Sequence, residues 1–219
     1  RNAFCAAPVV VAKQHLEQRR AEHRSPRYWL INTGNANAGT GEAGLRDARA
    51  CCAELAKQVG VATEDIMPFS TGVIGEPLPM EKLLAGLTPA LESLSSDSVA
   101  WEHAGQGILT TDTRAKGASV TVEIGNQQVT INGITKGSGM IKPNMATMLG
   151  FVVTDAAIEA PLLDRLLRET VDRSFNCITV DSDTSTNDAC MLAATGTGPR
   201  IADEAQIAAF SNALQRVMT

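Results

Sequence analysis

A glycine-loosened loop that runs directly into an apolar strand, at residues 136–149, constrains this chain more than any other segment. Gly137 and Gly139 loosen the loop, and the apolar run 148–153 begins immediately after Thr147. A residue that opens a buried strand is fixed on its strand side and reachable on its loop side, so the Thr147 hydroxyl is well placed to act as a nucleophile. The alternative, a β-branched residue that merely opens a strand, is the default for a threonine taken at random.

Composition bounds the class of protein. A chain of 219 residues with 44% hydrophobic and 20% charged residues is typical of a globular protein of one or two domains. The net charge of −5, without a concentrated basic patch, argues against a nucleic-acid partner. The longest apolar run is far shorter than the roughly 20 residues of a membrane span, so we expect no membrane partner. The chain opens at Arg1 without a signal peptide, and we expect the natural N-terminus to lie upstream.

The cysteines and histidines favour free thiols and no metal. Five cysteines, an odd number without C-x-x-C spacing, are typical of buried free thiols in a reducing cytoplasm. The scattered residues His15, His23 and His103 have no cysteine or carboxylate cluster at ligand spacing around them. We therefore predict a cytoplasmic protein without a metal site.

Strand and helix patterns are mixed without a regular βαβ rhythm, which predicts an α/β or α+β layered sandwich with mixed sheets. The clearest signals are a hairpin turn at Gly125-Asn126, a helix stop at Gly60 and a D-x-x-Q capping box at Asp203. We expect strands at residues 7–11, 28–32, 118–124, 127–132, 149–154 and 178–181. We expect helices at residues 13–24, 47–59, 80–87, 90–94, 98–104, 161–175 and 203–217, with a further helix starting at residues 188–194.

Two polar loops carry weaker signals. Residues 39–44 match the dinucleotide pattern G-x-G-x-x-G, but several residues separate the first glycine from the preceding strand. A nucleotide-binding module is therefore an alternative, and a loop that lines another site is favoured. Residues 181–188 lack the glycine and terminal glutamate of a calcium loop. Their short polar side chains favour a turn-fixing role, or a role in supporting a site.

The absence of a histidine after Ser138 argues against a Ser-His-Asp hydrolase. A threonine at a chain end supplies its own base, because an α-amino group with a pKa of about 7.7–8.0 can take the hydroxyl proton. That route requires cleavage of the Ala146–Thr147 bond, which the same hydroxyl performs by attacking the Ala146 carbonyl. The oxyanion needs preorganised donors, and Thr71-Gly72 offers a hydroxyl and a backbone N–H. The alternative for Thr71-Gly72 is an ordinary turn.

Six ordered segments give the chain a resemblance to ornithine acetyltransferases: residues 32–38, 69–75, 108–113, 136–141, 143–149 and 174–188. The resemblance implies a fold of the N-terminal-nucleophile-like ornithine acetyltransferase type and a self-processed enzyme. Its α chain is residues 1–146, N-terminally truncated here. Its β chain starts with residues 147–219, and family members continue beyond this point.

The resemblance also implies the site and the reaction. Thr147 is the nucleophile, Thr71 and Gly72 form the oxyanion hole, and Thr110, Lys136 and Thr147 contact the substrate. N-acetylornithine acetylates Thr147, and glutamate then takes the acetyl group, as part of arginine biosynthesis. No cofactor is implied, although some members accept acetyl-CoA as a donor.

The family's α and β chains usually assemble as α2β2. Three other hypotheses about the function remain open at this point. They are an N-terminal-nucleophile amidohydrolase or aminopeptidase, the nucleotide-binding module, and a scaffold that does not process itself.

Overall fold

The computed structural model describes residues 4–141, 148–181 and 183–219. The chain divides into two compact units, Arg1–His103 and Ala104–Thr219, and each is described by itself. This division reflects packing and does not test the expected boundary between residues 1–146 and 147–219. That boundary concerns a covalent bond, and it stays a prediction.

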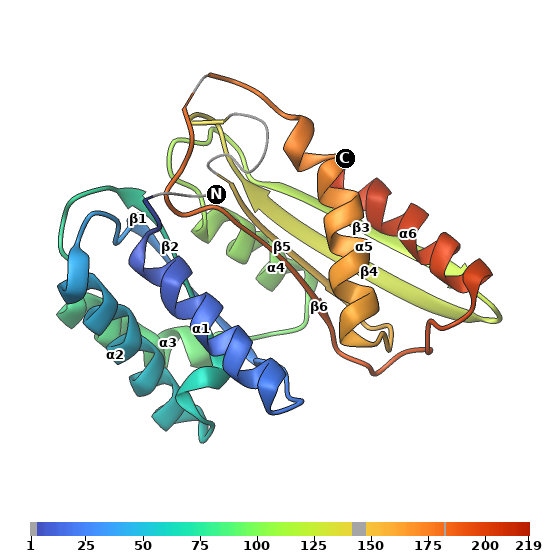
Figure 1. Ribbon diagram of the computed structural model, residues 1–219, viewed down its shortest axis with the longest axis horizontal. Coiled ribbons are helices and arrows are strands. Elements are labelled where there is room, and N and C mark those ends of the chain that lie inside the picture. The colour runs from blue at the N-terminus through green and yellow to red at the C-terminus, as the bar shows by residue number, and fades with distance from the viewer. Residues whose placement is uncertain (1–3, 142–147, 182) are drawn as a thin grey trace. The chain divides into compact units, whose positions relative to one another are not determined.

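The first unit is built on two parallel strands, β1 (Tyr28–Asn35) and β2 (Ile66–Val73). Helices α1 (Ala7–Ala21) and α2 (Gly41–Val59) pack against β2 and against each other (Figure 1). The 3-10 turn Thr63–Asp65 precedes β2, and α3 (Met80–Glu92) packs on α2. The core of this unit consists of aliphatic and small side chains: Val11, Ala48, Cys52, Leu55, Ala56, Ile66 and Leu87.

Two predictions for this unit are wrong. Residues 7–11 begin α1 and do not form a strand, because Pro8 suits the first helical turn and Val11 packs completely buried in the core. The two helices expected at residues 80–87 and 90–94 form one helix, α3, which continues through Pro89. The predicted stop of α2 at Gly60 is confirmed, and this glycine takes the left-handed conformation with φ 70°.

The second unit is a mixed sheet with the strand order β3-β4-β5-β6. Its strands are β3 (Lys116–Ile124), β4 (Gln127–Lys136), β5 (Leu149–Thr154) and β6 (Ala189–Ala194). The pairs β3–β4 and β4–β5 are antiparallel, whereas β5–β6 is parallel. The helices of this unit are α5 (Ala160–Asp172) and α6 (Glu204–Met218), with a 3-10 turn at Phe175–Cys177, and α4 (Ser98–Gly107) crosses the boundary between the two units.

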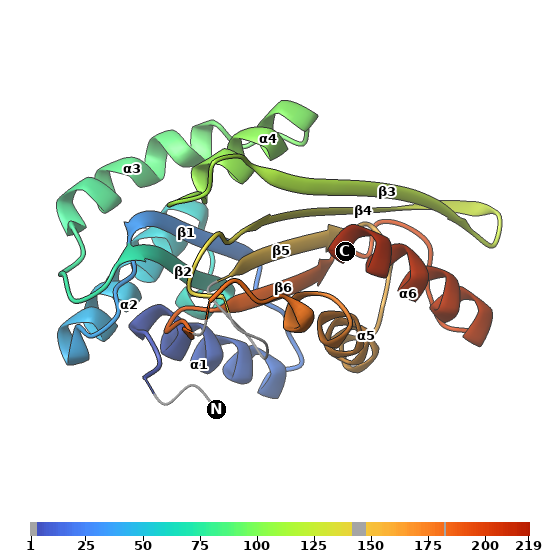
Figure 2. The same ribbon diagram turned by 90° about the horizontal axis from the view of Figure 1, so that it is seen from above.

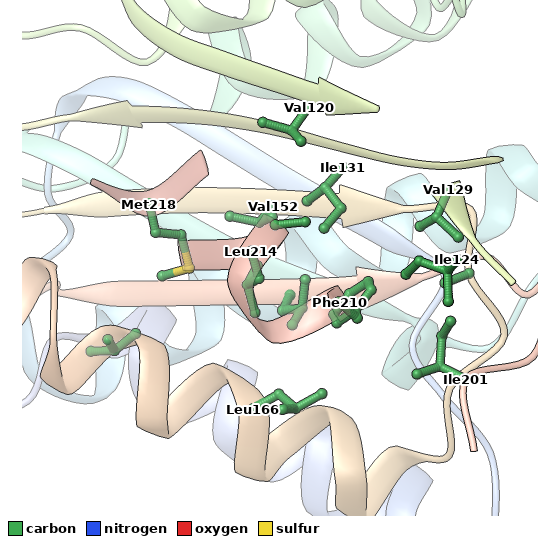
Figure 3. Close-up of a cluster of buried hydrophobic side chains, with 14 residues drawn as sticks. Val120, Ile124, Val129, Ile131, Val152, Leu166, Ile201, Phe210, Leu214 and Met218 are labelled. Carbon is green, nitrogen blue, oxygen red and sulfur yellow. The ribbon is translucent and has the colours of Figure 1, made fainter. Parts of the chain in front are cut away.

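Helices α5 and α6 cover one face of this sheet (Figure 2). The buried side chains between sheet and helices form one cluster, in which Val152 of β5 faces Phe210 and Leu214 of α6 (Figure 3). Leu166 closes the cluster from α5, as the apolar face predicted for this helix requires. At Gly133 of β4 a Cβ would lie 2.8 Å from α6, so the glycine permits the close approach of that helix.

Most of the predicted elements of this unit are confirmed. The hairpin turns at Gly125-Asn126, and the expected strand 149–154 is β5. The capping box starts α6, with Gln206 N–H donating to the Asp203 carboxylate at 2.8 Å. The helix expected to start at residues 188–194 is wrong, because this segment is strand β6 and pairs with β5. The strand expected at residues 178–181 is wrong, because residues 178 and 179 are irregular and residues 180 and 181 lie in a bend.

Within the described ranges, no helix is long and apolar enough to cross a membrane. No group of three or more histidine, cysteine or acidic side chains there is arranged to hold a metal ion. The five cysteines carry free thiols. Burial raises the pKa of the Cys52 thiol to about 12, and burial alone raises that of Cys190 to about 12.

Candidate active site

The Thr71-Gly72 step lies at the end of β2, opposite Thr33 and Gly34 of β1. The register shifts at Asn35, which opposes both Thr71 and Val73, so the pair ends in a bulge. Thr71 is 4% exposed, and Gly72 has a φ of 134°. A Cβ on Gly72 would lie 2.3 Å from the Gly34 carbonyl carbon and 2.6 Å from the Asn35 nitrogen. Only glycine fits here, and the step lies within strand β2 and not in an ordinary turn.

Asparagine side chains hold the backbone around this bulge. Asn35 Nδ2 donates to the carbonyls of Glu76 and Pro77 at 3.2 and 3.0 Å, which ties β1 to the segment after β2. Asn35 Oδ1 accepts from the backbone N–H of Asn37 at 2.7 Å. Asn32 of β1 and Ser70 of β2 are partners in the same strand pair, and Ser70 Oγ donates to Asn32 Oδ1 at 2.5 Å. The backbone at Thr71-Gly72 is therefore preorganised by neutral hydrogen bonds and steric fit.

The glycine pattern of residues 39–44 serves local packing. Asn37 is fully buried with a φ of 47°, and its Nδ2 donates to the Gly44 carbonyl at 2.9 Å. Its Oδ1 accepts from Thr40 Oγ1 at 2.7 Å. A Cβ on Gly44 would lie 2.3 Å from Asn37 Oδ1, so glycine is needed to seat this asparagine against α2. These contacts give Gly44 a structural role, whereas a Cβ on Gly41 would meet nothing within 4 Å.

In the second unit, the segments that carry Thr110 and Lys136 are joined by two hydrogen bonds. Thr110 lies in the exposed turn between α4 and β3, and Lys136 is the last residue of β4. Thr111 Oγ1 and Ser138 Oγ are 2.7 Å apart, and Gly137 N–H donates to Asp112 Oδ1 at 2.8 Å. The two predicted substrate contacts are thus brought to the same end of the sheet.

Lys136 is 2% exposed, and burial lowers the pKa of its ammonium. The carboxylates of Asp112 and Asp188 oppose this shift, and the ammonium of Lys116 adds to it. The side chain of Asp112 is itself fully buried and pairs with Lys116. Burial alone would raise the pKa of Asp112, but the hydrogen bonds from Lys116 and Gly137 lower it below its ordinary value. The nearby carboxylates thus offset part of the cost of burying the Lys136 ammonium.

Asp188, just before β6, holds the backbone at the start of β5. Its Oδ1 accepts from Met148 N–H at 2.9 Å, and Ala189 N–H donates to the Met148 carbonyl at 3.1 Å. Burial raises the pKa of Asp188. Asp181 likewise accepts from the backbone N–H groups of Met140 and Ile141 at 2.7 and 2.9 Å. The turn-fixing role expected of residues 181–188 is confirmed by local bonds, from Asp183 N–H to Asp181 Oδ1 at 3.2 Å and from Asn187 N–H to Ser185 Oγ at 3.0 Å.

The predicted site residues are distributed as follows. Thr71 and Gly72 belong to the first unit, and Thr110 and Lys136 to the second. Ala146 and Thr147, the predicted cleavage site and nucleophile, lie outside the described residues.

Sequence reasoning gave no role to Asp112. Its partner Gly137 lies 25 positions further along the chain, and no local sequence pattern predicts a contact between residues so far apart.

Comparisons with known proteins show the family to which this chain belongs. The model of the ArgJ family matches residues 1–219. The arginine biosynthesis bifunctional protein ArgJ of Methylococcus capsulatus is 54% identical over 220 residues, which cover 99% of this chain and 52% of that protein. Its namesake in Pseudomonas syringae pv. tomato is 53% identical over 195 residues, 89% of this chain and 46% of that protein. The chain belongs to the ArgJ family, and it spans about half the length of these curated relatives.

Solved structures agree with this assignment. The crystal structure of the arginine biosynthesis bifunctional protein ArgJ from Bacillus halodurans aligns with a TM-score of 0.56 and 34% identity, over 68% of this chain and 73% of that one. The ornithine acetyltransferase of Mycobacterium tuberculosis, solved in complex with ornithine, aligns with a TM-score of 0.54 and 29% identity, over 68% and 74%. The predicted mixed α/β fold of the ornithine acetyltransferase type and the family resemblance are confirmed.

Proposed function

We propose that this chain is part of a self-processed acetyltransferase that moves an acetyl group from N2-acetylornithine to glutamate in arginine biosynthesis. The observation that carries the proposal is the family match over residues 1–219, together with relatives named as bifunctional proteins of arginine biosynthesis. The similar Mycobacterium tuberculosis protein was solved with ornithine, the product that the first half-reaction would release.

In the proposed mechanism, the Thr147 hydroxyl attacks the Ala146 carbonyl, and hydrolysis of the resulting ester frees Thr147 as a chain end. Its α-amino group then serves as the base that accepts the hydroxyl proton. The acetyl group of N-acetylornithine moves to Thr147 Oγ1, ornithine leaves, and the glutamate amine takes the acetyl group from the ester.

Thr71 and Gly72 are proposed to stabilise the oxyanion of each step. The argument for them is preorganisation. A hydroxyl and an N–H that already point at the developing charge need no rearrangement during the reaction. The steric requirement for glycine at residue 72 and the hydrogen bonds around Asn35 support such a fixed backbone.

Thr110 and Lys136 are proposed to contact the substrate, with the Lys136 ammonium facing its α-carboxylate. Support comes from the two hydrogen bonds that join their segments and from the burial of Lys136, which strengthens its attraction for an anion. Acyl transfer through a threonine ester needs no cofactor, and acetyl-CoA is an additional proposed donor. We further propose an α2β2 assembly of the two chains in the cytoplasm.

A transfer assay tests this proposal against the hydrolase alternative. The full-length protein is incubated with N-acetylornithine, with and without glutamate, and ornithine, acetate and N-acetylglutamate are measured. We expect ornithine release that depends on glutamate and matches N-acetylglutamate in amount. Ornithine and acetate formed in equal amounts without glutamate would identify an amidohydrolase. Thr147→Ala, which lacks the nucleophile, is the control for background hydrolysis.

A further inference from the structure

We propose that Asp112 is a positioning residue, which holds the Thr110 segment against the end of β4 and supplies a fixed negative charge beside Lys136. The inference rests on the proposed function, in which Thr110 and Lys136 contact the substrate. Asp112 itself would touch no substrate atom and would act through Lys136 and the turn that carries Thr110.

The first part of the argument is geometric. The Asp112 carboxylate is fully buried, and its Oδ1 accepts from Gly137 N–H at 2.8 Å and also pairs with Lys116. Gly137 directly follows Lys136, so this bond fixes the backbone at the end of β4. The contact between Thr111 and Ser138 at 2.7 Å reinforces the same connection without any charge. Two neighbouring residues thus join the same two segments by different chemistry.

The second part concerns charge. Among the described residues, the carboxylates of Asp112 and Asp188 attract the Lys136 ammonium, and the ammonium of Lys116 repels it. On β5, the residue in register with Lys136 is the apolar Leu149. Burial lowers the pKa of Lys136, and the nearby carboxylates oppose this shift, so they extend the pH range over which its ammonium is charged.

The carboxyl groups of Asp112 and Asp188 differ in how readily they ionise. The pKa of Asp112 is lowered by the hydrogen bonds of Lys116 and Gly137, although burial opposes them, whereas burial raises the pKa of Asp188. Asp112 is therefore the one that stays ionised over the wider pH range. If its charge is removed, the pKa of Lys136 falls further, and binding of a substrate carboxylate is lost at a lower pH.

The test is the pH dependence of KM for N-acetylornithine in the full-length enzyme. Asp112→Asn keeps an oxygen that can accept from Gly137 N–H, so it removes the charge and leaves the connection. Thr111→Val is the matched control, because it removes the other connection and leaves the charge. For Asp112→Asn we expect the alkaline rise of KM to move to lower pH by on the order of 1 unit, with kcat changed much less. For Thr111→Val we expect KM to change by a similar factor at every pH.

Two further variants keep the test decisive if Asp112→Asn folds poorly. Asp112→Glu retains the charge, so the alkaline rise of KM should return to its wild-type pH. Lys116→Met removes the repelling cation, so the alkaline rise of KM should move to higher pH. An alkaline rise of KM that is unmoved in Asp112→Asn, or that Asp112→Glu does not return to its wild-type pH, would overturn the role of Asp112. In that case glutamate-dependent transfer by the wild type would persist, whereas a wild type without such transfer would refute the proposed function itself.

Discussion

The two described regions that are proposed to contact the substrate are preorganised by different physics. Thr71-Gly72 is fixed by steric fit, since a Cβ at residue 72 would meet the backbone of Gly34 at 2.3 Å, and by neutral hydrogen bonds from asparagines. At Lys136 the end of β4 is held by the charged carboxylate of Asp112, which accepts from Gly137 N–H, and the carboxylates of Asp112 and Asp188 act on the buried ammonium.

This difference matches the two tasks. An oxyanion exists only briefly, and backbone donors that never titrate can stabilise it at any pH. A substrate carboxylate is charged throughout, and a cation binds it best, although a buried cation depends on nearby anions to stay protonated. The comparison predicts that changes at Gly72 act independently of pH, whereas changes around Lys136 depend on pH.

The largest effect within the described residues is expected for Gly72→Ala. The added Cβ collides with backbone atoms that cannot move alone, so the donors at residues 71 and 72 lose their alignment. We expect kcat to fall by about 10²–10³-fold, the range for loss of one oxyanion donor, by the same factor from pH 6 to pH 9. Steady-state kinetics of acetyl transfer at several pH values measures this.

Gly75→Ala is the matched control for that substitution. Gly75 also has a positive φ, 87°, but a Cβ there meets nothing within 4 Å. We expect a loss of stability of about 1–2 kcal/mol from the backbone conformation, with kcat of the folded enzyme retained. Equal losses of kcat in the two variants would contradict a steric origin at Gly72.

A smaller effect is expected for Lys136→Met, which removes the charge and keeps the length of the side chain. Loss of a hydrogen bond to a charged group corresponds to about a 10- to 100-fold rise in KM for N-acetylornithine. Because the substitution leaves the buried carboxylates of Asp112 and Asp188 without this cation, we also expect a lower Tm, and KM is compared at a temperature at which both proteins are folded. Lys57→Met, at a side chain 80% exposed in the first unit, serves as the control. A Lys136→Met enzyme with unchanged KM would remove this lysine from the site.

The smallest effect separates the two carboxylates within the charged region. Because the pKa of Asp188 is raised by burial, its ionisation costs stability as pH rises from about 4 through the raised value. The lowered pKa of Asp112 means that its charge contributes stability above about pH 4, and this contribution is lost as pH falls through the lowered value. Relative to the wild type, Asp188→Asn should therefore raise Tm at pH 7, and Asp112→Asn should lower it.

Both differences in Tm should shrink towards acidic pH. Thermal unfolding of the three proteins between pH 3.5 and 7 checks these signs. Shifts of the same sign at pH 7 would show that the two carboxylates do not differ in the way that their environments require.

The elements that the sequence predicted well are those with local signals. The hairpin at Gly125-Asn126, the helix stop at Gly60 and the capping box at Asp203 each depend on residues close in the chain, and all are confirmed. The errors fall where distant contacts decide. Residues 189–194 form strand β6 because β5 offers a parallel partner about 40 residues earlier in the chain. The β-branched run after Pro8 is helical because it packs against β2.

The candidate site divides in the same way. Thr71, Gly72, Thr110 and Lys136 were found because each lies in a segment that resembles the family. Their roles stay predictions. Asp112 could not be found from the sequence, because its function depends on a contact across the sheet end.

The central claim is that Thr147 becomes the first residue of a new chain, and intact mass spectrometry of the purified full-length protein tests it most directly. The account predicts two polypeptides whose masses place the break between Ala146 and Thr147, and a Thr147→Ala variant that remains one polypeptide without acetyl transfer. A wild-type protein that transfers acetyl groups to glutamate at full rate while its chain is uncut would contradict the account.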